Sequence, residues 1–455
     1  MADARAIAAV PAAEPTLRQR VMKLAGPTLA EQFLVSAVGI ADMVMVGRIG
    51  PAAIAAVGLT NQPIMFLNSA LMALNVGTTA LVARLIGARQ VDRASAAAKQ
   101  TLAVASVLGV ILSIIAVVFA EPILKIMGAE PDVMQNGVGY FKVVGVGVFF
   151  GALAMNMTAS LRGAGDTKSA MQINIIANLF NICGNYLLIN GVLGFPRLEV
   201  VGAGIATTLS RLLASLMFFR ILTQGKKIIR PNFVERFALD WELLRRAFRV
   251  GIPAAVEQFV LRAGMLVFTT VVSGLGTVTF AAHQVGMNIM SISFMPGMAF
   301  SVAATTLVSQ NLGAEQPDEA ERSAAETRKI GMMVGMVAAA VFFFFGKYIA
   351  MMYSNDPGVI NQTASILKLY ALVQPAQSTA FILSGGLRGA GDTTWVLYAN
   401  ALGTWVGRVI IGYILVNAVG MGLMGAWIAM GIDQIGRSLL ISSRFKSGRW
   451  KTQKV

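Results

Sequence analysis

Charged residues are scarce in this sequence of 455 residues, where they make up 13% of the chain against about a quarter in a soluble protein. The single cysteine, Cys183, excludes an internal disulfide and a cysteine-based metal cluster. With a single histidine, His283, and scattered carboxylates, the chain also lacks the catalytic group that a membrane-embedded enzyme would display. That alternative is therefore disfavoured, and no enzyme activity is expected.

Apolar residues take the place of the missing charge. They make up 56% of the chain, and the mean hydropathy is +0.68. They fall in runs of about 20 to 30 residues, long enough to cross a hydrocarbon core of about 30 Å as a helix. The sequence predicts an all-α integral membrane protein with twelve transmembrane helices. The expected spans are 17–45, 52–83, 95–120, 133–160, 167–192, 199–223, 244–273, 277–309, 323–350, 358–385, 393–418 and 421–443.

Lysine and arginine gather in alternate loops and give the chain its net charge of +15. The richest segments are 84–99, 220–249 and 444–454, whereas the loops between them carry few basic residues. This bias follows the positive-inside rule, so both termini are expected on the cytosolic side of the inner (plasma) membrane. The charge then reflects topology, and the expected surroundings are a lipid bilayer without nucleic acid.

Two stretches of the sequence occur twice. PTLAEQF and PAAVEQF place Glu31 and Glu257 at an offset of 226 residues (257 − 31 = 226), and LRGAGDT at 161–167 recurs at 387–393 with the same offset. Six spans in each copy, an even number, bring the chain back to the side where it began. The two repeats are therefore parallel, with a pseudo-two-fold axis along the membrane normal. The predicted units are an N-terminal six-helix lobe at 1–223, a cytosolic linker at 224–243 and a C-terminal six-helix lobe at 244–455.

Several motifs carry a resemblance to a known family. They are IADMVMVGRIG at 40–50, LRGAGDT in both halves, AAHQVG at 281–286, LVSQNLGA at 307–314 and RFKSGRW at 444–450. Together they resemble the bacterial branch of the multidrug and toxic compound extrusion (MATE) transporters. The resemblance implies two lobes in a V shape that export organic cations or other amphipathic toxic compounds in exchange for Na⁺ or H⁺. It implies no cofactor beyond the coupling ion, and it leaves the oligomeric state open, with a monomer as one possibility.

Asp42 is the strongest candidate for coupling. An ionisable group at membrane depth costs several kcal/mol and calls for a function or a partner. Its counterpart in the second repeat is Phe268, so the shared architecture does not require the acid. In the resembled family this aspartate binds the coupling cation, and Asn181, Asn185 and Thr207 align with further positions of that site.

The nature of the coupling ion stays open. Several relatives carry a second acid where Asn185 stands, so a site with one carboxylate could serve Na⁺, held by Asp42 and Asn181, or H⁺. Asn178 belongs to the same helical stripe of amides, which could instead bind helices together.

Glu31 and Glu257 are present in both copies, which favours a structural role. Arg162 and Arg388, also repeated, are their expected partners. Both glutamates remain secondary site candidates.

The C-terminal half supplies two more secondary candidates. Gln377 lies near a position where relatives often carry an aspartate. Asp433 has the i, i+4 spacing to pair with Arg437, while Arg262 and Arg408 have no partner evident in the sequence. His283 could relay protons, but packing is favoured. A lipid-linked-precursor flippase of the same broad superfamily is the remaining alternative, disfavoured by the twelve expected helices and the RFKSGRW ending.

Overall fold

The computed structural model describes residues 15–224, 228–232 and 238–453. Within this part of the chain, twelve long helical segments form two lobes of six, as the sequence predicts. The N-terminal lobe consists of α1 (Leu17–Gly47), α2 (Pro51–Gly87), α3 (Val91–Val118), the short α4 (Ala120–Ile126), α5 (Pro131–Gly163), α6 (Thr167–Asn190) and α7 (Glu199–Thr223). The C-terminal lobe consists of α8 (Trp241–Ser273), α9 (Thr277–Gly313), α10 (Pro317–Met351), α11 (Pro357–Ala390), α12 (Thr393–Leu402), η1 (Gly403–Ile410), α13 (Ile411–Tyr413), η2 (Ile414–Ala418), α14 (Gly422–Lys446) and the 3₁₀ turn η3 (Arg449–Thr452).

Ten of the long segments are apolar enough, by length and composition, to cross a membrane. The other two, α11 and α14, carry buried polar side chains, among them Gln377 and Asp433. Both pack inside the C-terminal lobe, where such groups find partners within the protein instead of facing lipid.

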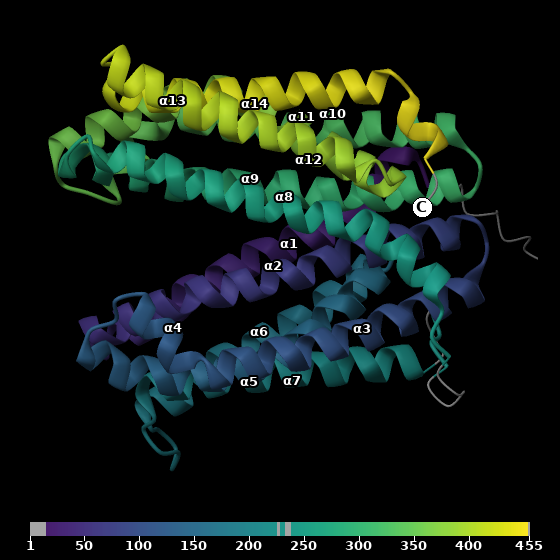
Figure 1. Cartoon of the computed structure of the whole chain (residues 1–455), viewed down its shortest axis with the longest axis horizontal. Coiled ribbons are helices and arrows are strands. Elements are labelled where there is room, and N and C mark those ends of the chain that lie inside the picture. The colour runs from purple at the N-terminus through teal and green to yellow at the C-terminus, as the bar shows by residue number, and fades with distance from the viewer. Residues whose placement is uncertain (1–14, 225–227, 233–237, 454–455) are drawn as a thin grey trace, which may run out of the picture.

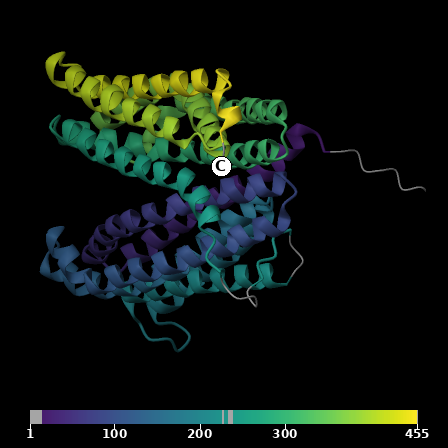
Figure 2. The same cartoon turned by 45° about the vertical axis from the view of Figure 1, so that its right-hand side comes forward.

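The two lobes diverge from one end of the molecule. Figure 1 shows them close together at the end that carries the segment between α7 and α8 and the C-terminus, which we call the linker end. They separate toward the opposite, far end, and the rotated view in Figure 2 shows the same divergence. Between the lobes, α2 packs against α8 and α9, and α1 packs against α9.

Glycines allow the lobes to meet backbone to backbone at the linker end. A Cβ on Gly87 of α2 would collide with the carbonyl of Gln310 on α9, and one on Gly313 would collide with the carbonyl of Arg84. These contacts exchange under the repeat, since 84 + 226 = 310 and 87 + 226 = 313. The side-chain amide of Gln310 also donates a hydrogen bond to the carbonyl of Gly163 at 3.0 Å, so a polar contact joins the two lobes as well.

We expect Gly87→Val and Gly313→Val each to force the linker end open, because the added side chain meets backbone that cannot move aside. A cysteine placed at Thr306, which is fully buried beside Arg162, should then react faster with a maleimide, in a background with the exposed Cys183 replaced by serine. Gly58→Val on the same α2 is the matched control, because a Cβ there meets nothing. Unchanged protection of position 306 in both valine variants would contradict this role of the glycines.

The eleventh span departs from regular α-helix. Its middle and end are π-helical, in η1 and η2, whereas its counterpart in the first repeat, α6, is regular throughout. Gly403 and Gly407 of η1 lie against Asp433 of α14, so closely that a Cβ on Gly403 would collide with the carboxylate. Single π-turns inside helices are often found at functional sites. The distortion therefore draws attention to the charged groups that surround it.

Candidate functional site

Asp42 lies on α1 and points into the N-terminal lobe, where it meets α6. The Nδ2 of Asn185 donates to its Oδ1 at 2.6 Å. With its amide nitrogen toward the carboxylate, Asn181 donates to the same oxygen at 3.3 Å, and its own oxygen accepts from the hydroxyl and the backbone N–H of Thr207, both at 3.2 Å. The opposite amide orientation would set the nitrogen of Asn181 against the Thr207 N–H, donor facing donor. The four residues aligned with the cation site thus lie together, from α1, α6 and α7.

The oxygen atoms of this group suit a hard cation. Asn185 Oδ1 is buried and accepts no hydrogen bond from the residues that the structure describes. A carboxylate oxygen and amide oxygens are the ligands that hard cations prefer. The same carboxylate could instead take up a proton, and its acid form could then donate to the unpaired Asn185 Oδ1 once that amide has rotated. The geometry fits both kinds of coupling ion.

Asn178 and Arg211 flank this group. Asn178 is half-buried and makes no side-chain hydrogen bond within the described ranges. Arg211, which the sequence did not single out, lies one turn beyond Thr207 on α7, and its Nη1 is buried without a hydrogen bond to any described residue. The sequence does contain a signal for Arg211, because it is a cationic residue on a predicted transmembrane span, four residues after the site residue Thr207.

The second repeat has no acid at the position of Asp42. Phe268 stands there, fully buried in an apolar cluster with Tyr370 and Trp427. His283 belongs to the same region, accepts a 3.3 Å hydrogen bond from the indole of Trp427 and is buried. The packing role favoured for His283 agrees with these contacts, and in the part of the C-terminal lobe that the structure describes an apolar cluster stands where the first repeat has Asp42.

Glu31 and Glu257 make equivalent contacts in the two lobes. Arg162 Nη2 lies 2.8 Å from both carboxylate oxygens of Glu31, and Asn174 donates to that carboxylate at 2.7 Å. In the C-terminal lobe Arg388 lies 2.5 Å from Glu257, and Asn400 donates to it at 2.7 Å. The predicted pairing of each glutamate with its arginine is confirmed.

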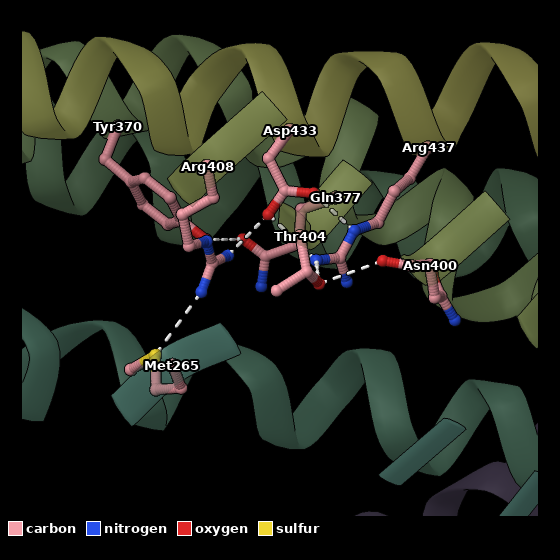
Figure 3. Close-up of polar contacts among 8 residues, drawn as sticks. All are labelled: Met265, Tyr370, Gln377, Asn400, Thr404, Arg408, Asp433 and Arg437. Carbon is pink, nitrogen blue, oxygen red and sulfur yellow. Dashed lines mark hydrogen bonds and ion pairs between the residues drawn. The ribbon is translucent and has the colours of Figure 1, made fainter. Parts of the chain in front are cut away.

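Asp433 lies between two arginines in the C-terminal lobe (Figure 3). It is fully buried, with Arg408 at 2.7 Å and Arg437 at 2.5 Å. Arg437 also donates to Thr404 Oγ1 at 2.7 Å, while the other end of Arg408 reaches the sulfur of Met265 on α8 at 3.4 Å. The predicted Asp433–Arg437 pair is confirmed, and Asp433 is also the partner that the sequence could not identify for Arg408.

Gln377 is close to this cluster but joined to a different group. Its side-chain oxygen accepts a hydrogen bond from the hydroxyl of Tyr370, which lies two helical turns earlier on α11 (Figure 3). Arg262, by contrast, forms no ion pair or hydrogen bond through its side chain with any residue in the described ranges. The structure thus brings Asp42 and its three aligned residues together, and separates them from Glu31, Glu257, Gln377 and Asp433.

Known proteins resemble this chain over nearly its whole length. The family model described as MatE matches twice, at residues 27–187 and 253–414. A probable multidrug resistance protein NorM of Thermotoga maritima is 30% identical over 97% of this chain and 95% of its own. The multidrug resistance protein MdtK of Yersinia pseudotuberculosis is 28% identical over 94% of each chain. An outward-facing multidrug resistance MATE family transporter of the MOP superfamily superposes with a TM-score of 0.88 and 24% identity, covering 95% of this chain and 97% of its own, which shows a shared fold.

Proposed function

Because the chain belongs to the MATE family of multidrug transporters, we propose that it is a secondary antiporter that exports small amphipathic organic compounds, organic cations among them, in exchange for Na⁺ or H⁺. The observation that carries this proposal is the group of Asp42, Asn181, Asn185 and Thr207. It offers one titratable carboxylate at membrane depth together with amide oxygens, in one lobe only. Such a group can exist with and without a bound cation, as coupling demands.

The arrangement of the lobes supports alternating access. They are in contact at the linker end and apart at the far end (Figure 1). If the linker end is cytosolic, as the distribution of basic residues favours, this is an outward-facing arrangement. Rocking one lobe against the other would close the far end and would separate the glycine contacts at Gly87 and Gly313, which opens the linker end.

Transport in sealed vesicles tests the function. Purified protein is reconstituted, a fluorescent amphipathic compound is loaded, and its movement is followed under a Na⁺ gradient alone and a pH gradient alone. We expect one of the two gradients to drive transport against the concentration gradient of the compound. No gradient-driven movement of any compound in a panel of cationic, zwitterionic and anionic dyes would contradict an antiporter.

The proposed orientation has its own test. Single cysteines at Arg230 and Lys451 should be labelled only from the cytosolic side, and one at Arg197, in the loop between α6 and α7, only from outside. The labelling uses a membrane-impermeant maleimide on whole cells and on inverted vesicles, with Cys183 replaced by serine because its side chain is exposed. The reverse pattern would overturn the orientation.

A further inference from the structure

Arg262 is a cation at membrane depth that has no partner among the described residues. It lies on α8, in a segment apolar enough to cross a membrane, and its buried Nε makes no hydrogen bond to any described residue. None of the ion pairs within the described ranges includes it. An unpaired guanidinium inside a membrane costs several kcal/mol and is found mainly where it serves a function. A negatively charged group that comes close to Arg262 would offset this cost.

Arg262 faces away from its own lobe. The side of α8 that packs against the C-terminal lobe carries Glu257, which contacts Asn400, and Phe268, which is fully buried. Three residues before Arg262, and therefore on its face of the helix, Phe259 stacks on Phe66 of α2 with ring centroids 6.4 Å apart. Arg262 is thus directed toward the N-terminal lobe.

The repeat supports this direction independently. The counterpart of Arg262 is Ser36 (262 − 226 = 36), and its hydroxyl lies 3.7 Å from the sulfur of Met295 on α9, in the opposite lobe. In both halves, the residue at this position is therefore directed toward the opposite lobe. On α8 the next turn toward the far end carries Leu266, which is 70% exposed, so Arg262 lies where the lobes begin to part.

The charge of the C-terminal lobe adds to that of Arg262. Two groups of ion pairs lie in this lobe, and together they contain more positive than negative charges. Three arginines, Arg388, Arg408 and Arg437, pair with only two carboxylates, those of Glu257 and Asp433. Arg408 extends toward α8, where it contacts Met265, which lies between Arg262 and the side of α8 that packs against its own lobe (Figure 3). The net positive charge of these groups and of Arg262 would repel an organic cation and attract an anion.

We propose that Arg262, together with Phe66 and Phe259, recognises the anionic group of an amphipathic aromatic substrate, a carboxylate or sulfonate attached to an aromatic ring system. The guanidinium offers two parallel N–H donors to such a group, and the phenyl rings offer faces on which the aromatic part can stack. The inference rests on the proposed transport function and specifies its substrate class, which includes anions and zwitterions and not simple cations alone.

Two pyrene compounds that share a ring system and differ in charge test this inference. Binding of 1-pyrenebutyrate and of 1-pyrenemethylammonium to the full-length protein, in nanodiscs of zwitterionic lipid, is measured by fluorescence titration. We expect the wild-type protein to prefer the carboxylate, and Arg262→Gln to weaken its binding by about tenfold or more, the size of a lost charge-assisted hydrogen bond. Arg262→Lys should retain part of the affinity, and Arg262→Glu should reverse the preference.

Arg197→Gln is the matched control, because Arg197 is exposed and pairs only at the surface with Glu199. Thermal unfolding of each variant checks that it is folded. Equal affinity of the wild-type protein for the two compounds, or unchanged carboxylate binding in Arg262→Gln, would overturn the inference. Gradient-driven export of the ammonium compound alongside such a result would leave the antiporter function standing, so the two failures are distinguishable.

Discussion

Asp42→Asn should abolish gradient-driven efflux while the protein still folds and inserts into the membrane. Asparagine has nearly the size and hydrogen-bonding reach of aspartate, so the contacts with Asn181 and Asn185 can largely persist. A neutral amide cannot alternate between an anionic and a proton- or cation-bound state, however. The difference in binding between the two conformations, which is what allows an ion gradient to shift their populations, is then lost. Efflux of a fluorescent compound from vesicles, under whichever gradient drives the wild type, measures the effect.

Asp318→Asn provides the control for that experiment. Asp318 is in the first turn of α10, 86% exposed, and its ion pair with Lys451 at 3.1 Å lies at the surface. Exposed pairs contribute little to stability, so this variant should transport like the wild type. Efflux at the wild-type rate in Asp42→Asn, with normal amounts in the membrane, would remove Asp42 from the coupling site.

Glu257→Gln and Glu31→Gln should unfold at markedly lower temperature without a change in ion preference. Each glutamate is buried and neutralises an arginine, Arg388 or Arg162, that is itself largely buried. Removing one partner of a buried ion pair leaves the other charge uncompensated and costs about 3–5 kcal/mol. The measurements are thermal unfolding in detergent and the yield of folded protein.

A paired substitution separates a structural role from a role in transport. Replacing both members of the pair, as in Glu257→Leu with Arg388→Met, removes the uncompensated charge and should recover much of the lost stability. Glu121→Gln, at an exposed surface pair with Lys125, should leave unfolding unchanged. Full stability of Glu257→Gln combined with a lost response to the ion gradient would show that the glutamate acts in coupling.

The helices could be predicted from the sequence because long apolar runs in a membrane have few alternatives to helix. The expected spans 167–192 and 393–418 correspond to α6, at Thr167–Asn190, and to the segment that runs from Thr393 to Ala418. Two details were not foreseen. The seven residues of α4 were too few to stand out at the end of a longer run. The π-helical turns, and the close packing of Gly403 and Gly407 against α14, have no signal in composition or periodicity.

Contacts within one helix could be predicted from the sequence, whereas contacts between helices could not be predicted from spacing alone. Asp433 and Arg437 are one turn apart on a single helix, so their spacing was enough to predict the pair. Arg408 comes from a different helix, and only the packing of η1 against α14 brings it to Asp433. The contact between Asp42 and Asn185 likewise crosses helices, and it was expected because of family resemblance and not from spacing. The roles of these residues in transport stay predictions.

The reciprocal contacts at the linker end also bear on how such a chain could have arisen. Gly87 meets Gln310 while Gly313 meets Arg84, so each half presents the same patch to the other. That self-complementary pattern is how two identical subunits join in a symmetric dimer. A six-helix ancestor could therefore have worked as a parallel homodimer before its gene was duplicated and fused. In a homodimer every residue is present in both subunits, so an aspartate in one half and a phenylalanine at the equivalent position of the other, as at Asp42 and Phe268, became possible only after duplication.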